Sequence, residues 1–328
     1  MTTRRRFLAL SGAALAAPLA VPAIPGAAFA EAAWPERPIR VICPFQAGST
    51  VDLLGRIVAD PLAAALGQTM IIENRGGAGG TIGSAAVAHA DPDGYTLLVN
   101  AAAHTAAPAA HPDINYDPAK DFAGIAMIGV VPNVIVIAPS KGIKTAQELV
   151  VRGKKEKLTF ASAGVGSATH WGAERFLLSA GFKAQHVPFR GGPAALTEVM
   201  TGRVDFMTIG TGSGLPLIKD GKLIALAVTT RKRSAVLPDV PTTLELGYKD
   251  SDYTFWNGFL APAKTPRPIV MRLHDEITRI ANTPEVKEKL ATQGVEPLPL
   301  TPDEFDELMR KEIVANLALA KAAGLTFN

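Results

Sequence analysis

Strands that alternate with helices constrain the fold of this chain more than any other feature of its sequence. The runs 39–44, 70–73 and 95–99 are short and apolar, and apolar residues at helical spacing follow in 52–66 and 81–89. Such alternation predicts parallel strands connected by helices, and therefore an α/β fold. We expect Pro61, late in the first helical run, to kink or restart that helix.

The same alternation begins again after residue 132, which indicates a second α/β unit. Strand-like and helical segments follow in the order 134–138, 145–154, 158–161, 168–178, 186–189, 193–201, 204–209, 215–219 and 223–229. The last third combines a strand at 255–261 with helical stretches at 268–282 and 302–323. We predict two lobes, each a mainly parallel sheet flanked by helices, with lobe 1 formed by 31–132 and 255–328 and lobe 2 by 133–254.

The N-terminus has the organisation of an export signal. Arg4, Arg5 and Arg6 precede an apolar run over 9–20, and Ala28-Phe29-Ala30 has the small residues of a cleavage site. The paired arginines before Phe7 resemble the twin-arginine type of signal. Prolines within 18–25 interrupt the apolar run well before it reaches the length of a membrane span. We predict a signal peptide over 1–30, cleavage after Ala30 and a periplasmic location.

Composition excludes several classes of protein. The chain has 33 basic and 30 acidic residues, and the three excess bases all lie in residues 1–30. The rest of the chain is neutral, so we expect no nucleic-acid partner. Charged residues make up 19% and apolar residues 48%, which argues against disorder. Cys43 is the sole cysteine, so the chain forms no internal disulfide.

Motifs for cofactors and catalysis are incomplete. The glycine-rich segment 77–83 has Ile82 where a dinucleotide fingerprint requires its third glycine, so we interpret it as a tight turn before a closely packed helix. His170 and Glu174 are spaced to share one metal ion, but a third ligand at a diagnostic spacing is missing. Ser162 or Ser167 could pair with His170 as nucleophile and base, yet nothing supplies an orienting carboxylate. We expect no cofactor, no metal and no catalytic residue, with a Ser167–His170 hydrolase as a remote alternative.

Two loops combine glycine, serine and a helix start. Ser49-x-x-Asp52 is a capping box, in which the serine side chain caps the third helical amide and the aspartate reaches back to the serine N–H. The amides of Thr50 and Val51 are then left without partners at a helix end that favours anions. The second loop, over 160–167, ends in Ser167 as an N-cap. If the two loops face each other they form a carboxylate clamp of backbone N–H groups; the alternative is two ordinary, well-capped connections.

The sequence resembles the extracytoplasmic solute receptors of the tripartite tricarboxylate transporter family, the Bug-type binding proteins. The matching segments cover the whole chain after residue 30 and are Trp34–Ile39, Pro44-Phe45 with Gly48 and Asp52, Glu73–Gly80, Asp93–Leu98, Tyr116-Asp117, Asp121-Phe122, His186–Gly191, Leu237–Thr242, Gly258 and Ala261-Pro262. The chain departs from the family pattern at Ser49, at Phe189 and at Pro61. The resemblance implies a two-lobed periplasmic binding protein of the Venus-flytrap type that has no catalytic residues and binds a small carboxylate between its lobes.

The resemblance and the two loops together define a candidate ligand site. Lobe 1 would contribute Phe45, Gly48, Ser49, Thr50 and Val51, with Asp52 supporting the helix cap and a wall formed by Asn100, Ala101, Ala102 and Ala103. Lobe 2 would contribute Ser162, Gly164, Gly166, Ser167, His170, Gly210 and Thr211. Neither loop contains Lys or Arg, so the identity of the carboxylate stays open among aromatic, hydroxy- and dicarboxylic acids.

The partners implied by this assignment are a small organic carboxylate and the membrane permease of a tripartite carboxylate transporter. We expect a monomer that closes on its ligand about chain crossings near residues 133 and 255. A periplasmic sensor that presents its ligand to a signalling kinase would share every one of these sequence features.

Overall fold

The computed structural model describes residues 34–253 and 255–323. The predicted signal peptide, with its cleavage site after Ala30, lies outside the described residues. Within them, no helix is both long and apolar enough to cross a membrane.

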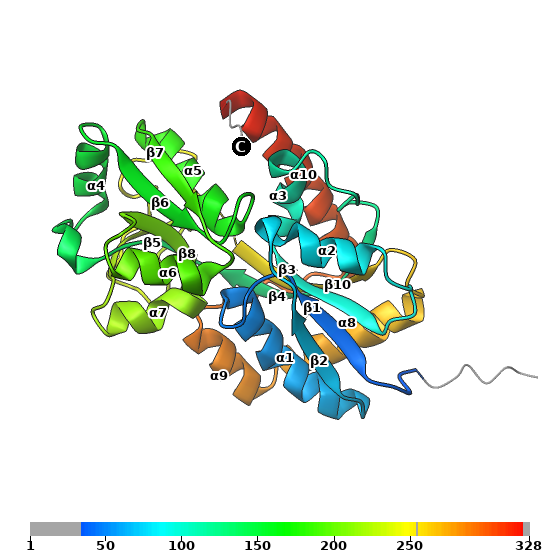
Figure 1. Cartoon of the computed structure of the whole chain (residues 1–328). Helices are drawn as coiled ribbons and strands as arrows, with labels where there is room; N and C mark the ends of the chain where they lie inside the picture. Colours follow the sequence, from blue (N-terminus) through cyan, green and yellow to red (C-terminus); the bar gives the residue numbers. More distant parts are fainter. Residues whose placement is uncertain (1–33, 254, 324–328) are drawn as a thin grey trace, which may run out of the picture. The chain divides into compact units, whose positions relative to one another are not determined.

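Two five-stranded sheets organise the chain from residue 35 onward (Figure 1). The first has the strand order β2-β1-β3-β10-β4, with bounds β1 (Ile39–Cys43), β2 (Met70–Asn74), β3 (Thr96–Ala101), β4 (Phe122–Val131) and β10 (Phe255–Pro262). The second has the order β7-β6-β8-β5-β9, with bounds β5 (Asn133–Ile137), β6 (Leu158–Ser162), β7 (Ala184–Pro188), β8 (Phe206–Gly210) and β9 (Ile224–Val228). From here on, lobe 1 denotes the first sheet with its helices and lobe 2 the second sheet with its helices.

The α/β class and the two-lobed fold are confirmed, but the sheets are mixed rather than mainly parallel. In lobe 1, β1 pairs in parallel with β2 and β3, whereas β10 pairs antiparallel with β3 and β4. In lobe 2, β6 pairs in parallel with β7 and β8, whereas β5 pairs antiparallel with β8 and β9. The antiparallel strands are those next to the points where the chain passes from one sheet to the other.

Three elements of lobe 1 are not predicted from the sequence. Strand β4 escapes prediction because its ten residues are continuously apolar with two glycines and show no alternation. Two helices escape it as well: α3 (Ala103–Ala110), which consists mostly of alanine and includes Pro108, and α9 (Pro284–Thr292). Helix α1 (Thr50–Leu66) continues through Pro61, so the expected restart at that proline is wrong.

The other lobe 1 helices are α2 (Thr81–Ala88), α8 (Arg267–Ala281) and α10 (Pro302–Ala323). Helix α1 packs against α8 and α9, while α3 packs against α2 and α10. Figure 1 shows these two groups on opposite sides of the first sheet. Both faces of that sheet are therefore covered, and β3 is almost entirely buried.

Lobe 2 has its core on both faces of the second sheet. Its helices are α4 (Ala146–Gly153), α5 (Ala168–Ala180), α6 (Gly192–Met200) and α7 (Thr211–Lys219). Strand β5 sends Ile135 and Ile137 to the core under α4 and α5, and Val134 and Val136 to the core under α6 and α7. Because successive strand residues point to opposite faces, one apolar run fills both cores.

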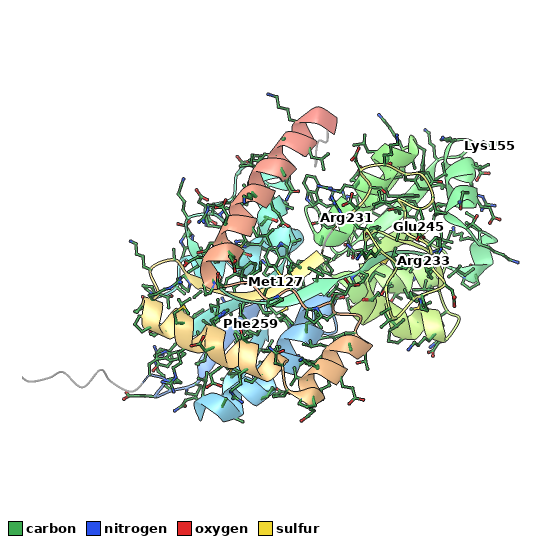
Figure 2. All side chains as sticks on the ribbon, turned by 180° about the vertical axis from the view of Figure 1, so that it is seen from behind. Met127, Lys155, Arg231, Arg233, Glu245 and Phe259 are labelled. Atoms are coloured by element: carbon green, nitrogen blue, oxygen red, sulfur yellow. The ribbon has the colours of Figure 1, made fainter. Side chains whose placement is uncertain are left out.

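The chain returns from lobe 2 to lobe 1 through a long segment after β9, which ion pairs and backbone bonds hold in place. Arg233 Nε lies 2.9 Å from Glu245 Oε2, a pair labelled in Figure 2, and Arg231 Nε lies 2.9 Å from Asp252 Oδ2. Thr229 N–H donates to Asn133 O, and Tyr253 N–H donates to Thr229 O. Phe255 also pairs with Val131, so the described residues at the ends of the two crossings between the sheets lie side by side.

Candidate functional site

The first functional loop follows the carboxyl end of β1 and starts α1. Ser49 has the extended backbone of an N-cap, with φ −68° and ψ 156°, and its Oγ accepts from Asp52 N–H at 3.3 Å. Asp52 Oδ2 accepts from Gly48 N–H at 2.9 Å, because Ser49 N–H already donates to Gln46 O. The predicted capping box is therefore present with its return bond shifted by one residue.

Asp52 is the anchor of this loop. Its Oδ1 accepts from Asn74 Nδ2 at 2.9 Å and from Arg56 Nε at 3.1 Å, and its side chain is only 3% exposed. Burial by itself would raise the pKa of Asp52, but the hydrogen bonds from Arg56, Asn74 and Gly48 outweigh it and lower the pKa below its ordinary value. The carboxylate stays charged and holds the helix start in place.

The second functional loop repeats this arrangement at the start of α5. Ser167 has φ −65° and ψ 158°, and its Oγ accepts from His170 N–H at 3.3 Å. Gly166 N–H donates to His170 Nδ1 at 3.1 Å, as Gly48 N–H does to Asp52. The segments Gly-Ser-Thr-Val-Asp (48–52) and Gly-Ser-Ala-Thr-His (166–170) are thus equivalent, with the third helical residue capping the glycine amide in both.

Both helix starts leave two amides without an acceptor. Among residues 34–253 and 255–323, the N–H groups of Thr50 and Val51 meet no hydrogen-bond acceptor, nor do those of Ala168 and Thr169. The first amides of a helix have no partner within the helix, and the helix dipole places partial positive charge there. Each loop therefore presents a pair of donors suited to an anion.

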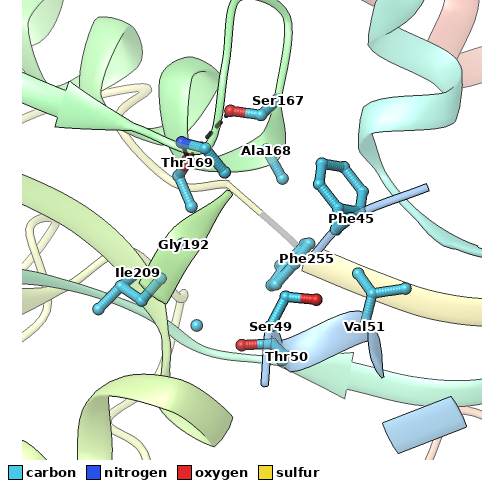
Figure 3. A pocket seen from close by; sticks show the side chains of 12 residues that line it. Phe45, Ser49, Thr50, Val51, Ser167, Ala168, Thr169, Gly192, Ile209 and Phe255 are labelled. Carbon is cyan, nitrogen blue, oxygen red and sulfur yellow. Dashed lines mark hydrogen bonds between the residues drawn. The ribbon is translucent and has the colours of Figure 1, made fainter. Parts of the chain in front are cut away.

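A cavity lies between the two loops. Figure 3 shows the side chains of Ser49 and Thr50 on one side and those of Ser167 and Thr169 on the other. Its lining consists of Phe45, Ser49, Thr50, Val51, Ala163, Ser167, Ala168, Thr169, Gly192, Ile209, Gly210 and Phe255. The volume is about 30 Å³, which is room for about two water molecules.

Four helices begin at this cavity. The lining includes the N-terminal residues of α1, α5 and α6, and Gly210, the N-cap of α7. None of the lining side chains is charged. The field at the cavity is therefore set by four positive helix ends and by hydroxyl groups, not by a Lys or Arg cation.

Six of the residues predicted from the sequence line the cavity, namely Phe45, Ser49, Thr50, Val51, Ser167 and Gly210. Gly48, Asp52, Gly166 and His170 do not line it but hold the two helix starts through the bonds described above. Thr211 Oγ1 donates to Gln293 O of lobe 1 at 2.8 Å.

The predicted wall at 100–103 does not line this cavity. Asn100 Nδ2 donates to Ser84 Oγ at 3.1 Å, Asn100 Oδ1 accepts from Ala101 N–H, and Ala102 and Ala103 start α3. These residues are buried beside β10 and support lobe 1 from within.

His170, Ser162 and Gly164 form the support beneath the second loop. The His170 ring stacks on the His186 ring with centroids 3.8 Å apart, and His186 stacks in turn on Phe160. His186 Nε2 lies 2.6 Å from Ser162 Oγ, which donates to Gly164 O and accepts from Gly164 N–H. Burial, and next the neighbouring His170, lower the pKa of His186 to about 3, so its imidazole is neutral.

The remote hydrolase pairing of Ser167 with His170 is not assembled. Ser167 Oγ contacts His170 N–H and Thr169 Oγ1, while His170 Nδ1 accepts from Gly166 and its Nε2 lies 3.6 Å from Glu174 Oε1. The serine and histidine that do meet are Ser162 and His186, and Ser162 is fully buried and lines no part of the cavity. In the described part of the chain, no three His, Cys, Asp or Glu side chains are grouped to hold a metal ion.

Six lining residues are not predicted from the sequence, namely Ala163, Ala168, Thr169, Gly192, Ile209 and Phe255. Ala168 and Thr169 could have been found, since they stand in the second loop where Thr50 and Val51 stand in the first. Ile209 and Phe255 carry no local signal, because only the strand order places them here.

Comparison with known proteins identifies the family of this chain. Residues 54–325 match the family model described as "Tripartite tricarboxylate transporter family receptor". The protein BugT of Bordetella pertussis is 33% identical over 287 residues, covering 85% of this chain and 87% of BugT.

Two solved structures from Rhodopseudomonas palustris are similar over most of the chain. MatC with bound malate is 32% identical with a TM-score of 0.84, covering 87% of this chain and 99% of MatC. Rpa4515 with adipate is 30% identical with a TM-score of 0.86, covering 89% of this chain and 99% of that protein. The chain therefore belongs to the tripartite tricarboxylate transporter receptor family and is a Bug-type solute-binding receptor.

Proposed function

We propose that this receptor captures a small organic carboxylate between its lobes in the periplasm and delivers it to the permease of a tripartite carboxylate transporter. The observation that carries the proposal is the convergence of four helix N-termini on one cavity lined without charged side chains. Such a site attracts an anion through oriented amides and helix dipoles.

The ligand carboxylate would be held by amides from both lobes. Thr50 and Val51 N–H donate from lobe 1, Ala168 and Thr169 N–H from lobe 2, and the hydroxyls of Ser49 and Ser167 lie beside them. Because backbone amides and hydroxyls bind many carboxylates, selectivity depends on the shape set by Phe45, Ile209 and Phe255. The malate and adipate found in the two R. palustris relatives are carboxylates of suitable size for a first screen.

Binding requires the two lobes to move apart and to close again. A cavity of about 30 Å³ admits no organic acid in the present arrangement. The two chain crossings near residues 133 and 255 are suited to act as hinges, with residues 31–132 and 255–328 moving as lobe 1 and 133–254 as lobe 2. We further propose that the exported protein works as a monomer after cleavage of its signal peptide following Ala30.

A thermal-shift screen of carboxylates, with cationic and neutral solutes included as controls, tests the proposal on the mature protein, together with mass spectrometry of any acid retained from native periplasm. We expect at least one carboxylate to raise the melting temperature and to be recovered unchanged. Small-angle scattering should then show a smaller radius of gyration at saturation and a monomeric mass. A screen in which only cationic or neutral solutes bind would reject the carboxylate assignment, and chemical conversion of the acid would reject the receptor assignment.

A further inference from the structure

A single peptide group of lobe 2 is held at both ends, once by each lobe. The carbonyl of Val165 accepts from Nε2 of His111, at the end of α3 in lobe 1, with a distance of 2.9 Å. The N–H of the same peptide belongs to Gly166 and donates to His170 Nδ1 at 3.1 Å. Since a peptide group is planar, these two bonds together fix its orientation.

Glycines on both lobes allow this contact. A Cβ atom on Gly79 would lie 1.9 Å from Val165 O, and one on Gly166 would lie 2.6 Å from Ala110 Cβ and 3.1 Å from His111 Nε2. Gly79 and Gly166 also have positive φ angles, +64° and +75°, which disfavour other residues. Close contact between backbones therefore explains the glycines of the turn at 76–80. The incomplete dinucleotide motif does not explain them.

The position of this peptide links it to the ligand site. It directly precedes Ser167, the N-cap whose helix start presents the amides of Ala168 and Thr169 to the cavity. His111 and Gly79 line no part of the cavity, so they touch the site only through this loop. Their contacts join the two lobes and therefore exist only when the lobes are together.

We propose that His111 and Gly79 are positioning residues that form a latch on the Val165 carbonyl and orient the lobe 2 binding loop in the closed state. This inference rests on the proposed function, because it assigns the latch to ligand retention. A contact made after closure slows the release of ligand, so its loss raises the dissociation rate. Because ligand enters only the open protein, loss of the contact also raises the association rate by the gain in open fraction.

The first test needs no ligand. Dyes attached at Ile71→Cys in lobe 1 and Val151→Cys in lobe 2, both exposed positions, report the closed fraction of the free protein by single-molecule energy transfer. Burial raises the pKa of the Cys43 thiol to about 12, so this cysteine does not compete for the dye. We expect His111→Ala and Gly79→Ala to lower the closed fraction and His111→Gln, which keeps a side-chain N–H, to restore part of it.

The matched control is His89→Ala, which removes a histidine that ends α2 just as His111 ends α3. It should leave the closed fraction unchanged, and melting curves should show all variants folded. If His111→Ala and Gly79→Ala close as often as the parent protein does, the latch does not exist. The latch is rejected equally if the free parent protein never closes.

The second test uses whichever of L-malate or adipate raises the melting temperature of the parent protein. Stopped-flow kinetics should show the dissociation rate of that acid increased about two- to tenfold in His111→Ala, while the association rate rises only as far as the open fraction does. A dissociation rate equal to that of the parent protein would overturn the latch. If neither acid binds, that choice of ligand loses support, and the ligand-free test still decides the latch.

Discussion

Thr50 Oγ1 of lobe 1 and Ser213 Oγ of lobe 2 lie 3.0 Å apart and form a hydrogen bond between the lobes. Ser213 Oγ also lies 3.2 Å from Gly48 O and donates to it, so Thr50 is the donor in the Thr50–Ser213 pair. The residue whose amide we assign to the ligand therefore also binds the opposite lobe through its hydroxyl. Removing the amide and removing the hydroxyl are separate experiments.

Thr50→Pro should weaken carboxylate binding about ten- to a hundredfold, because it deletes an amide that donates to a charged group. Proline is tolerated at the first helical residue, and the extended Ser49 already has the backbone that a following proline requires. Titration calorimetry with a carboxylate from the screen measures the affinity.

Thr50→Val is the matched control, since it keeps the amide and removes only the bond to Ser213. Its affinity should fall about two- to tenfold, the effect of one neutral hydrogen bond. Equal losses in the Pro and Val variants would show that the amide does not contact the ligand.

Gly210→Ala should hinder closure while leaving each lobe folded. Gly210 has an ordinary backbone, φ −64° and ψ 141°, but a Cβ there would lie 2.8 Å from Thr50 Oγ1 and 2.9 Å from the Phe255 ring. We expect a melting temperature close to that of the parent protein and a radius of gyration that no longer decreases at saturating ligand.

Gly192→Ala provides the comparison, because its added Cβ would meet only Ile209 of its own lobe, at 3.1 Å. Scattering curves of this variant should still contract on binding. If Gly210→Ala contracts as well, the lobes do not close onto Gly210.

Asp52→Asn should lower the free energy of unfolding by about 2–3 kcal/mol, because an amide places a donor against Gly48 N–H or against Arg56 and Asn74. The pKa of Asp52 is lowered on folding, so its contribution is present above about pH 4 and is lost as the pH falls further. Urea unfolding at several pH values should show that the difference in free energy of unfolding between the parent protein and the variant becomes smaller below pH 4.

Asp60→Asn, an exposed position on the same helix, should change the free energy of unfolding by less than about 0.5 kcal/mol. If the difference in free energy of unfolding between Asp52→Asn and the parent protein stays constant down to pH 3, the stabilising effect does not depend on the charge of Asp52.

His186 should make the protein less stable in mild acid. Its pKa falls from 6.5 to about 3 on folding, so the unfolded chain binds a proton below pH 6.5 while the folded protein does not. The contribution of His186 to the free energy of unfolding is therefore greatest above pH 6.5 and declines as the pH falls towards 3. Between pH 7 and pH 5, the free energy of unfolding should fall by about 1 kcal/mol less in His186→Gln than in the parent protein, a figure reduced because His186 is partly exposed. Identical pH profiles in urea unfolding would show that His186 does not titrate on unfolding.

Much of the fold follows from periodicity, and the failures of prediction share a cause. The α/β alternation predicts most strands and helices, because apolar spacing reflects burial on one or two faces. Strand β10 is predicted, but its antiparallel insertion between β3 and β4 is not, since pairing partners far apart in the chain leave no local pattern. Strand β4 shows no alternation, and helix α9 has only Val286 and Leu290 as buried positions, too few to predict a helix from.

The two helix starts follow from the local order of residues, because a cap involves residues within four positions of one another. Ser49 with Asp52 and Ser167 with His170 are local bonds that the order of residues makes possible. Which groups face the cavity, and which bind the opposite lobe, depends on how the whole chain packs. His170, predicted as a ligand residue, caps Gly166 and does not line the cavity, while Phe255 reaches the cavity because β10 returns beside β4. Contacts between Thr50 and Ser213, or His111 and Val165, join residues more than fifty positions apart, and only the packing of two complete lobes brings them together.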